Sequence, residues 1–422
     1  ILAQVCGSEP ALQHQIPAMV QSKLPPRRAW LGPESCMRLP LQCVVLLASW
    51  SSVAQTACSV TSFNAMTTLS PSAAGYFRAL GWVPAASNGG SDLLVAGGED
   101  QQLRVWQLSG SSPSITGSLI NTLGSIHGTI WAFEWISAHS VMVSGSGDGF
   151  IRVWPLSVLN NAQACHVEAN GNGNALCCDG DGLGCEGKYV VSWRDAQMTR
   201  AGQVHALEWI ASESILASSW SDGVVRLWTY DAANTPPLTY RNSFTPTGRA
   251  YSLTWLAGPG QLAITSPDST LPELWDKDAT TTPARVLTKE LPDGFGYCPT
   301  AHCGAVRASA ADSGGTTLAT ASEDTKVKLW TASTGAMAHT FDGHATAASA
   351  VEWMHSESKL VSGGSDGSIF LWDPTNLGSS SSLSSVSSAH SGQVSALLWM
   401  GSLDTLASAS YDLTVKLWHC AR

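Results

Sequence analysis

Residues 408–418 read SASYDLTVKLW: small residues, an Asp six positions before a Trp, and alternating apolar residues that end in that Trp. The same pattern recurs six more times, and one copy is degenerate because its Asp and Trp lie seven positions apart. The Trp residues that end the pattern are Trp106, Trp154, Trp228, Trp275, Trp330, Trp372 and Trp418. Self-similarity of this kind is typical of repeat architectures, in which each unit needs its neighbours to bury its faces.

A second signal precedes the first in six repeats, where a tripeptide such as FEW, LEW or VEW ends in another Trp. Each unit alternates apolar and polar residues with period two between Gly, Ser and Asp turns, and no segment shows a helical period. We therefore expect an all-β chain of seven four-stranded units. Such units bury both faces only by stacking, and radial stacking closes the array into a ring.

Composition excludes several other classes of protein. The 422 residues include 18 Trp and only 13% charged residues, which excludes a disordered chain and a coiled coil. The net charge is −10 and no basic run is present, so a nucleic-acid partner is not expected. The long apolar stretch, residues 39–48, is too short to span a bilayer.

Over roughly residues 64–422 the repeats resemble the WD40 family, whose units run about 40 to 45 residues. The resemblance implies a seven-bladed β-propeller. It also implies a buried hydrogen-bond network of His, Ser or Thr, Asp and Trp in each complete blade. The matching sets are His127, Ser144, Asp148 and Trp154; His302, Thr320, Asp324 and Trp330; His344, Ser362, Asp366 and Trp372; and His390, Ser408, Asp412 and Trp418.

The third repeat lacks the His and keeps Ser218, Asp222 and Trp228, while the first and fourth repeats lack the network. We expect those two blades to be the less rigid ones. A Ser-His-Asp set can also indicate a catalytic triad, but recurrence in four repeats favours a structural role.

Ring closure predicts one long-range strand pairing. Only four residues follow Trp418, too few for the outer strand of the last blade. The stretch NAMTTLS, residues 64–70, is strand-like and precedes the first blade. We expect it to supply that outer strand, which leaves no open sheet edge.

The N-terminal region divides into residues 1–36, an irregular leader, and residues 37–54, a candidate signal peptide with a basic residue, an apolar core and a small-x-small end. The alternatives are an apolar segment of a disordered leader or an extra strand. The propeller would then occupy residues 55–422.

Cysteine positions bear on the compartment. Eight of the 11 Cys follow residue 54, and none lies in a repeated core strand, which favours pairing. Cys58 and Cys420 flank the two strands that should meet in the last blade, so we predict a disulfide between them. These features favour the secretory route or an extracytoplasmic lumen; the alternative is the cytoplasm.

Residues 160–189 form an insertion between the second and third repeats, with a CCDGDGLGCEG segment. A calcium loop and a zinc site both fit its spacing poorly, and a surface loop held by disulfides fits better. No metal or cofactor is expected.

Three functions compete: a binding scaffold for a protein or peptide, an architectural subunit of a large assembly, and an enzyme. No Gly-rich phosphate loop, HExxH or GxSxG motif occurs, so we expect no catalysis. In the WD40 family, partners often contact side chains six and four positions before the inner-strand Trp and the one before the Asp. Those predicted partner-binding residues include Tyr76, Arg78, Trp131, His205, Arg249, Tyr251, Arg307 and Tyr411. Three Arg on an acidic chain suggest a partner with acidic or phosphorylated groups.

Overall fold

The computed structural model describes residues 62–70, 75–124, 128–160, 166–169, 175–178, 189–193, 202–234, 237–278, 283, 285–286 and 301–421. Contacts divide the chain into two units, Ile1–Thr56 and Ala57–Arg422, and every described residue belongs to the second unit. The leader at 1–36, the candidate signal peptide at 37–54, His127 and Cys58 lie outside the described residues. Of Cys420 only the backbone is described, so the predicted disulfide stays a prediction.

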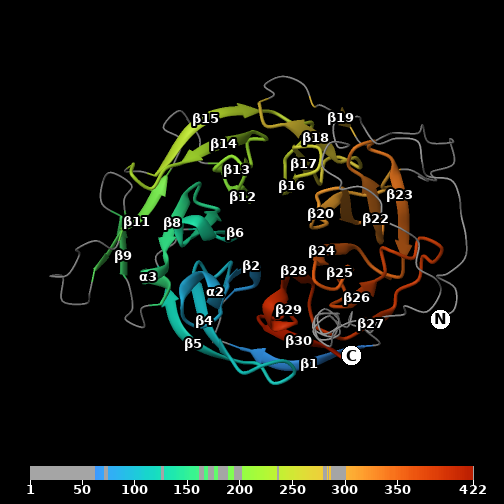
Figure 1. Ribbon diagram of the computed structural model, residues 1–422, viewed down its shortest axis with the longest axis horizontal. Coiled ribbons are helices and arrows are strands. Elements are labelled where there is room, and N and C mark those ends of the chain that lie inside the picture. Colours follow the sequence, from blue (N-terminus) through green and yellow to red (C-terminus); the bar gives the residue numbers. More distant parts are fainter. Residues whose placement is uncertain are drawn as a thin grey trace, which may run out of the picture. The chain divides into compact units, whose positions relative to one another are not determined.

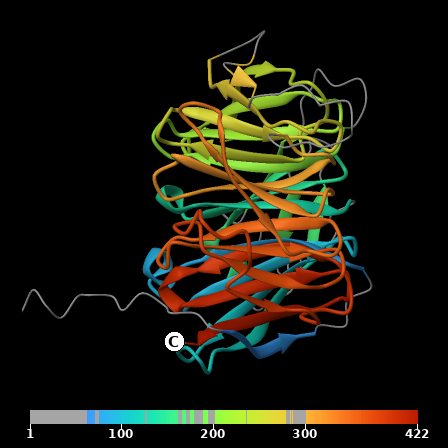
Figure 2. The same ribbon diagram turned by 90° about the vertical axis from the view of Figure 1, so that its right-hand side faces the viewer.

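Seven antiparallel sheets form a ring in the second unit (Figure 1), and successive sheets lie face to face (Figure 2). Each sheet is one blade. The inner strands lie nearest the centre of the ring in Figure 1.

The first four blades contain the following strands, inner to outer. Blade 1 has β2 (Phe77–Val83), β3 (Leu93–Gly98), β4 (Leu103–Ser109) and β5 (Thr116–Leu123); blade 2 has β6 (Ile130–Ile136), β7 (Val141–Ser146), β8 (Ile151–Pro155) and β11 (Tyr189–Trp193); blade 3 has β12 (Val204–Ile210), β13 (Ile215–Trp220), β14 (Val225–Tyr230) and β15 (Leu238–Phe244); blade 4 has β16 (Ser252–Leu256), β17 (Gln261–Thr265), β18 (Glu273–Asp276) and β19 (Arg285–Val286).

The remaining blades follow the same order. Blade 5 has β20 (Val306–Ala311), β21 (Thr317–Ser322), β22 (Lys326–Thr331) and β23 (Met337–Asp342); blade 6 has β24 (Ala348–Met354), β25 (Lys359–Gly364), β26 (Ile369–Trp372) and β27 (Ser384–Val386); blade 7 has β28 (Val394–Met400), β29 (Thr405–Ser410), β30 (Val415–Ala421) and β1 (Ser62–Leu69).

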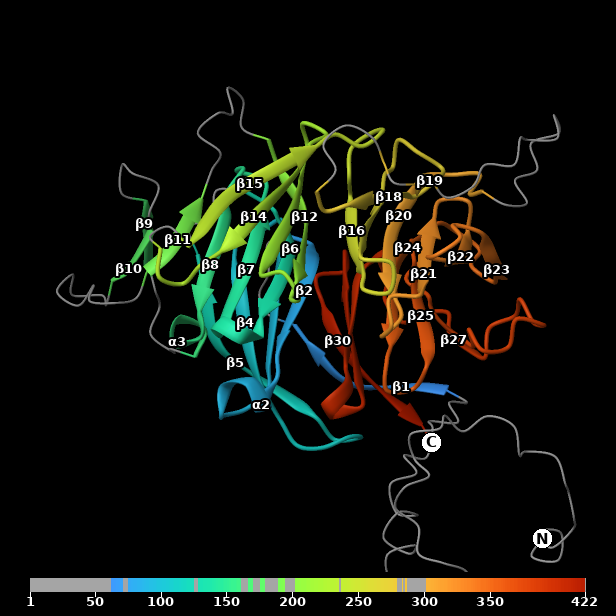
Figure 3. The ribbon, with the colours of Figure 1, turned by 45° about the horizontal axis from the view of Figure 1, so that its top comes forward.

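Blade 7 confirms the predicted closure. Its outer strand β1 pairs antiparallel with β30, with Phe63 opposite Cys420 and Leu69 opposite Val415 (Figure 3). Phe63 and Leu69 are both buried at 5% exposure, so the N-terminal strand contributes apolar surface as well as hydrogen bonds. The two ends of the propeller are thus joined within one sheet.

Blade 2 is wider than the others because of the insertion. A hairpin of β9 (His166–Ala169) and β10 (Ala175–Cys178) adds to the outer strand β11, which makes a six-stranded sheet. The insertion therefore extends the outer side of one blade and leaves its inner strands in place.

The core lies between blades, where the Trp that ends each third strand is buried. Trp154, Trp228, Trp330 and Trp372 have no exposed surface, and Trp275 is 1% exposed. Such Trp side chains pack against apolar residues of a neighbouring blade, as Trp154 does with Val83 and Leu93 of blade 1. Each blade thus buries a large aromatic side chain against its neighbour, which contributes apolar burial that a single four-stranded sheet lacks. No helix among the described residues is long and apolar enough to cross a membrane.

Candidate functional site: the rim where the inner strands begin

A β-bulge near the start of most inner strands creates the candidate site. In six blades, pairing between the first and second strands skips one residue, and a bulge of this kind re-aims the side chain of the skipped residue. The skipped residues are Arg78, Trp131, His205, Arg307, Ser349 and Ser395. In blade 4 the equivalent residue, Tyr251, directly precedes β16. Four of the eight residues predicted for partner binding, Arg78, Trp131, His205 and Arg307, are therefore bulge residues.

Seven of the eight predicted residues touch one another in a continuous series, which we call the rim arc. Its members are Tyr76, Arg78, Trp131, His205, Arg249, Tyr251 and Tyr411. Arg307 is the eighth, and among the described residues it pairs with Glu323 of its own blade and makes no ring contact with the arc.

The rim arc begins between blades 7 and 1. The Tyr76 and Tyr411 rings stack with centres 4.8 Å apart. The guanidinium carbon of Arg78 lies 4.7 Å from the centre of the Tyr411 ring and 4.5 Å from that of Trp131. Arg78 thus joins the aromatic residues of blades 7 and 2 by cation–π contacts.

The arc continues through blades 2, 3 and 4. Trp131 and His205 stack with ring centres 5.1 Å apart and planes 2° apart. The Tyr251 ring meets His205 edge-to-face at 4.5 Å, and Arg249 lies 5.9 Å from the Tyr251 ring. The result is an aromatic surface built from five blades, rich in residue types that dominate binding interfaces.

Each rim arginine already has a carboxylate partner. Arg78 binds Glu99 at 2.5 Å, Arg249 binds Asp268 at 3.0 Å, and Arg307 binds Glu323. The side chains of these three acids are between 34% and 42% exposed, so the rim presents paired charges rather than an excess of positive charge.

His205 is uncharged at neutral pH. Burial and, as a second cause, the nearby Arg249 cation together lower the pKa of His205 to about 4. Its side chain therefore offers one N–H donor and one nitrogen acceptor.

The predicted structural network is brought together in blades 5 and 7. In blade 7 Trp418 Nε1 donates to Ser408 Oγ at 2.7 Å, Ser408 Oγ lies 2.7 Å from His390 Nε2, and His390 Nδ1 donates to Asp412 at 2.8 Å. Blade 5 repeats this geometry with Trp330, Thr320, His302 and Asp324. The hydroxyls of Ser408 and Thr320 have no exposed surface, so a substrate cannot reach them.

Blade 6 differs at one link of the network. His344 Nε2 lies 2.6 Å from Ser362 Oγ, which accepts from Trp372 Nε1 at 2.8 Å. Asp366 does not bind His344 directly, because Ser368 Oγ lies between them, 2.5 Å from Asp366 and 3.4 Å from His344 Nδ1.

In blade 2 the network Asp binds an arginine, and the predicted His partner, His127, lies outside the described residues. Trp154 Nε1 donates to Ser144 Oγ at 2.8 Å as predicted for the family, but Asp148 pairs with Arg152 at 2.5 Å. Burial alone would raise the pKa of Asp148; the hydrogen bonds and charge of Arg152 outweigh it and lower that pKa.

Blades 1, 3 and 4 use related solutions. Asp222 pairs with Arg226 at 2.8 Å in blade 3, where Ser218 accepts from Trp228, and Asp100 pairs with Arg104 in blade 1. In blade 4, Trp275 Nε1 donates to Glu273 at 2.8 Å, so a carboxylate takes the place of the missing hydroxyl. The lower rigidity expected of blades 1 and 4 stays a prediction.

Three inner-strand glutamates were not singled out by the sequence analysis. Glu208 accepts from the main-chain N–H of Trp255 at 2.8 Å and Glu352 from that of Trp399 at 3.3 Å, each reaching the next blade. Burial raises the pKa of Glu208 to about 7 and that of Glu352 to about 8, and it also raises that of Glu134. In the sequence, these three residues are marked by a Glu directly before the Trp in FEW, LEW and VEW.

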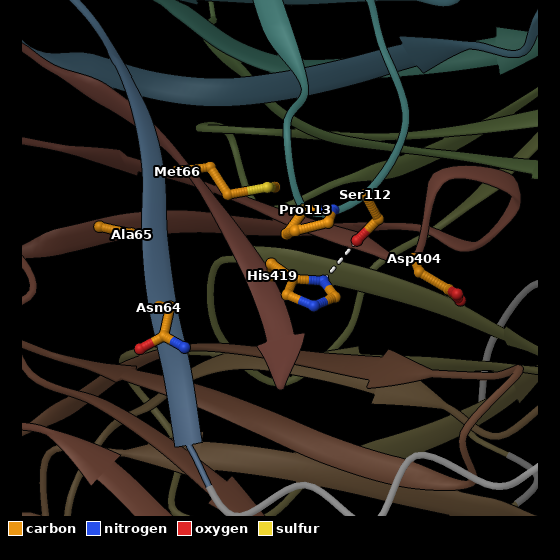
Figure 4. Close-up of a pocket in the computed structure, with 7 residues that line it drawn as sticks. All are labelled: Asn64, Ala65, Met66, Ser112, Pro113, Asp404 and His419. Carbon is orange, nitrogen blue, oxygen red and sulfur yellow. Dashed lines mark hydrogen bonds between the residues drawn. The ribbon is translucent and has the colours of Figure 1, made fainter. Parts of the chain in front are cut away.

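A pocket of about 750 Å³ lies at the closing seam, away from the rim arc (Figure 4). It is lined by Asn64, Ala65 and Met66 of β1, by His419, by the Ser112–Pro113 loop and by Asp404. Ser112 Oγ and His419 Nδ1 are hydrogen-bonded across it. The bond ties the loop between β4 and β5 of blade 1 to the end of β30.

Comparison with known proteins agrees with this architecture. The family described as WD domain, G-beta repeat matches residues 117–155, 296–331, 335–373 and 381–419. The crystal structure of the WD40 beta propeller domain of Doa1 superposes with a TM-score of 0.61 at 15% identity, covering 86% of this chain and 98% of that one. The chain carries WD40 repeats and is a seven-bladed WD40 β-propeller.

One curated relative is Periodic tryptophan protein 2 of Arabidopsis thaliana, which is 27% identical over 187 residues. The match covers 40% of this chain and 20% of that protein, so this chain spans only a fifth of the relative's length.

Proposed function

We propose that this propeller is a non-catalytic scaffold that binds a protein or peptide through the rim arc. The observation that carries the proposal is the unbroken contact series from Tyr76 to Arg249. It brings three Tyr, one Trp, one His and two Arg together along the rim. Aromatic and Arg side chains held in place by one another lose little conformational entropy on binding.

An acidic or phosphorylated group on the partner is not required by the rim. Each rim arginine is already paired with a carboxylate, so an incoming anion would compete with Glu99, Asp268 or Glu323. The partner class is therefore a protein or peptide, without a required anionic group.

The test compares three rim variants, Trp131→Ala, Arg249→Ala and Tyr251→Ala, with a matched control. Partners captured from native source by the full chain are measured against each variant. A hot-spot truncation costs about 2 kcal/mol or more, roughly a 30-fold loss of affinity. Tyr240→Ala is the control, because Tyr240 is 47% exposed on the outer strand β15 and lies outside the arc.

Normal binding by all three rim variants would overturn the proposal. Loss of binding in Tyr240→Ala alone would move the interface to the outer strands. A complex of fixed stoichiometry that survives every rim substitution would instead make the chain an architectural subunit.

A further inference from the structure

Three buried, unpaired nitrogens meet at the middle of the rim arc. Trp131 Nε1, His205 Nδ1 and His205 Nε2 are three of nine buried side-chain nitrogen and oxygen atoms that lack a hydrogen-bond partner among the described residues. His205 is only 7% exposed. An unpaired buried polar group costs about 1 to 3 kcal/mol, so this concentration at one contact indicates a group that is supplied from outside.

Trp131 has no free ring face for a ligand. Arg78 of blade 1 lies over its ring at 4.5 Å, and His205 of blade 3 stacks on it at 5.1 Å. Because blades 1 and 3 flank blade 2, these contacts take opposite faces of the indole. A cation or a flat apolar group therefore finds no face to occupy, and the indole edge with its N–H is what remains.

The residue beside that edge is Gly147, which has no side chain to accept the N–H. A Cβ built there would lie 3.5 Å from Trp131 Nε1. The corresponding residues of blades 1 and 5 are Glu99 and Glu323, whose carboxylates hold Arg78 and Arg307. Blade 2 thus leaves open a position that a carboxylate side chain fills in blades 1 and 5.

The charges around the pair balance one another. Arg78 and Arg249 are each bound to a carboxylate, and His205 is neutral because of burial and the Arg249 charge. A carboxylate or phosphate would gain no net attraction here. The pair offers two donors, the indole N–H and one imidazole N–H, together with one acceptor nitrogen.

We propose that Trp131 and His205 form a subsite for an uncharged amide of the bound peptide, either a main-chain peptide group or an Asn or Gln side chain. An amide carries an acceptor oxygen and an N–H donor on one rigid group, which complements the two donors and one acceptor of the pair. This inference rests on the proposed function of the rim arc. Because the three nitrogens are buried, a neighbouring side chain has to turn aside as the amide enters.

The test follows the Trp131 indole N–H signal of the full chain by nuclear magnetic resonance, assigned by its loss in Trp131→Phe. The probes are acetamide for a side-chain amide, N-methylacetamide for a main-chain amide, and acetate and methylammonium as charged controls. We expect a saturable shift with at least one amide and none with either ion; the amide that binds more tightly identifies the source.

A second measurement removes the hydrogen bond and keeps an aromatic ring. In Trp131→Phe, amide affinity followed at the His205 ring nitrogens should fall several-fold, up to about tenfold, the value of one hydrogen bond. Tyr240→Ala, on the outer strand β15, should leave that affinity unchanged. Tighter binding of acetate or methylammonium, no shift with either amide, or unchanged affinity in Trp131→Phe would overturn the subsite.

The proposed function and the proposed subsite can be disproved independently of each other. The amide titration needs no natural partner, so a silent indole signal overturns the subsite and leaves the rim as a binding surface. Partner binding that ignores every rim variant overturns the proposed function and leaves the subsite as a property of the fold.

Discussion

Blades 1 to 3 and blades 5 and 7 neutralise the equivalent Asp in different ways. In blades 2 and 3 an Arg four residues further along the same hairpin binds the Asp, at 2.5 Å in blade 2 and 2.8 Å in blade 3. In blades 5 and 7 a His located 22 residues earlier binds it, at 2.8 Å in both. The local Arg pair secures one turn, whereas the His pair ties two segments of the chain together.

The difference has a consequence for stability. His390 and Asp412 have side chains 0% and 8% exposed, whereas Asp222 of blade 3 is 35% exposed. An ion pair with a solvent-exposed member contributes little to the free energy of unfolding. Interrupting a buried hydrogen-bonded network lowers that free energy much more. The His blades should therefore depend more strongly on their networks than blade 3 does.

The largest effect is expected on removal of the outer strand of blade 7, which tests whether the His network alone keeps this blade folded. Deleting residues 55–70 removes β1, exposes the edge of β30 and loses the burial of Phe63 and Leu69. We expect the free energy of unfolding to fall by several kcal/mol, a large part of the stability of a typical domain. Chemical denaturation of the full and shortened chains measures the loss. An unchanged unfolding midpoint would show that blade 7 does not need its fourth strand.

The next effect compares the two kinds of network directly. His390→Ala should cost about 2 to 4 kcal/mol, because it leaves Asp412 and Ser408 buried without their shared partner. Arg226→Ala should cost about 1 kcal/mol, because water can reach Asp222. Equal losses in denaturation experiments on the two variants would remove the distinction between local and long-range networks.

Much of the fold was predictable because its signals are local. The period-two alternation and the seven Trp in register identify strands and blades from short windows, and the strand-like stretch at residues 64–70 indicated the strand that closes the last blade. The observed outer strand is Ser62–Leu69. Strand ends shift by a residue or two because frayed ends depend on tertiary contacts.

The networks were harder to predict, because the partner of the Asp differs from blade to blade. Family resemblance pointed to a His, yet the first three repeats also place Arg four residues after the Asp, as in SGSGDGFIRVW at residues 144–154. Spacing alone does not say that the hairpin turn brings this guanidinium back to the carboxylate. The contacts of the rim arc could not be predicted from the sequence either, because they join side chains from five different blades.

A third way to neutralise a buried acid is protonation, as at Glu352. The pKa of Glu352 is about 8 in the folded chain and near 4.5 when unfolded, so the stability it provides is lost as pH rises from about 5 to 8. Glu352→Gln does not titrate, so its stability relative to the parent should rise by about 3 to 4 kcal/mol over that interval. Glu213→Gln is the control, because Glu213 is 37% exposed beside Lys277. Melting curves at several pH values that stay parallel for Glu352→Gln and the parent would contradict the raised pKa.

The smallest expected effect restores a missing part of the network in blade 1. Ala96 lies opposite Arg104, as Ser144 lies opposite Arg152, so a hydroxyl at Ala96 would take the position that accepts the indole N–H in blade 2. Ala96→Ser should therefore stabilise the chain by about 0.5 to 1 kcal/mol, because the new hydrogen bond to Trp106 slightly exceeds the cost of burying the hydroxyl. Ala96→Cys has nearly the same size but a weak acceptor, and it should gain nothing. Calorimetric melting of both variants decides the matter: a loss of stability in Ala96→Ser would mean that blade 1, with its Asp100–Arg104 pair, is packed for an apolar residue at this position.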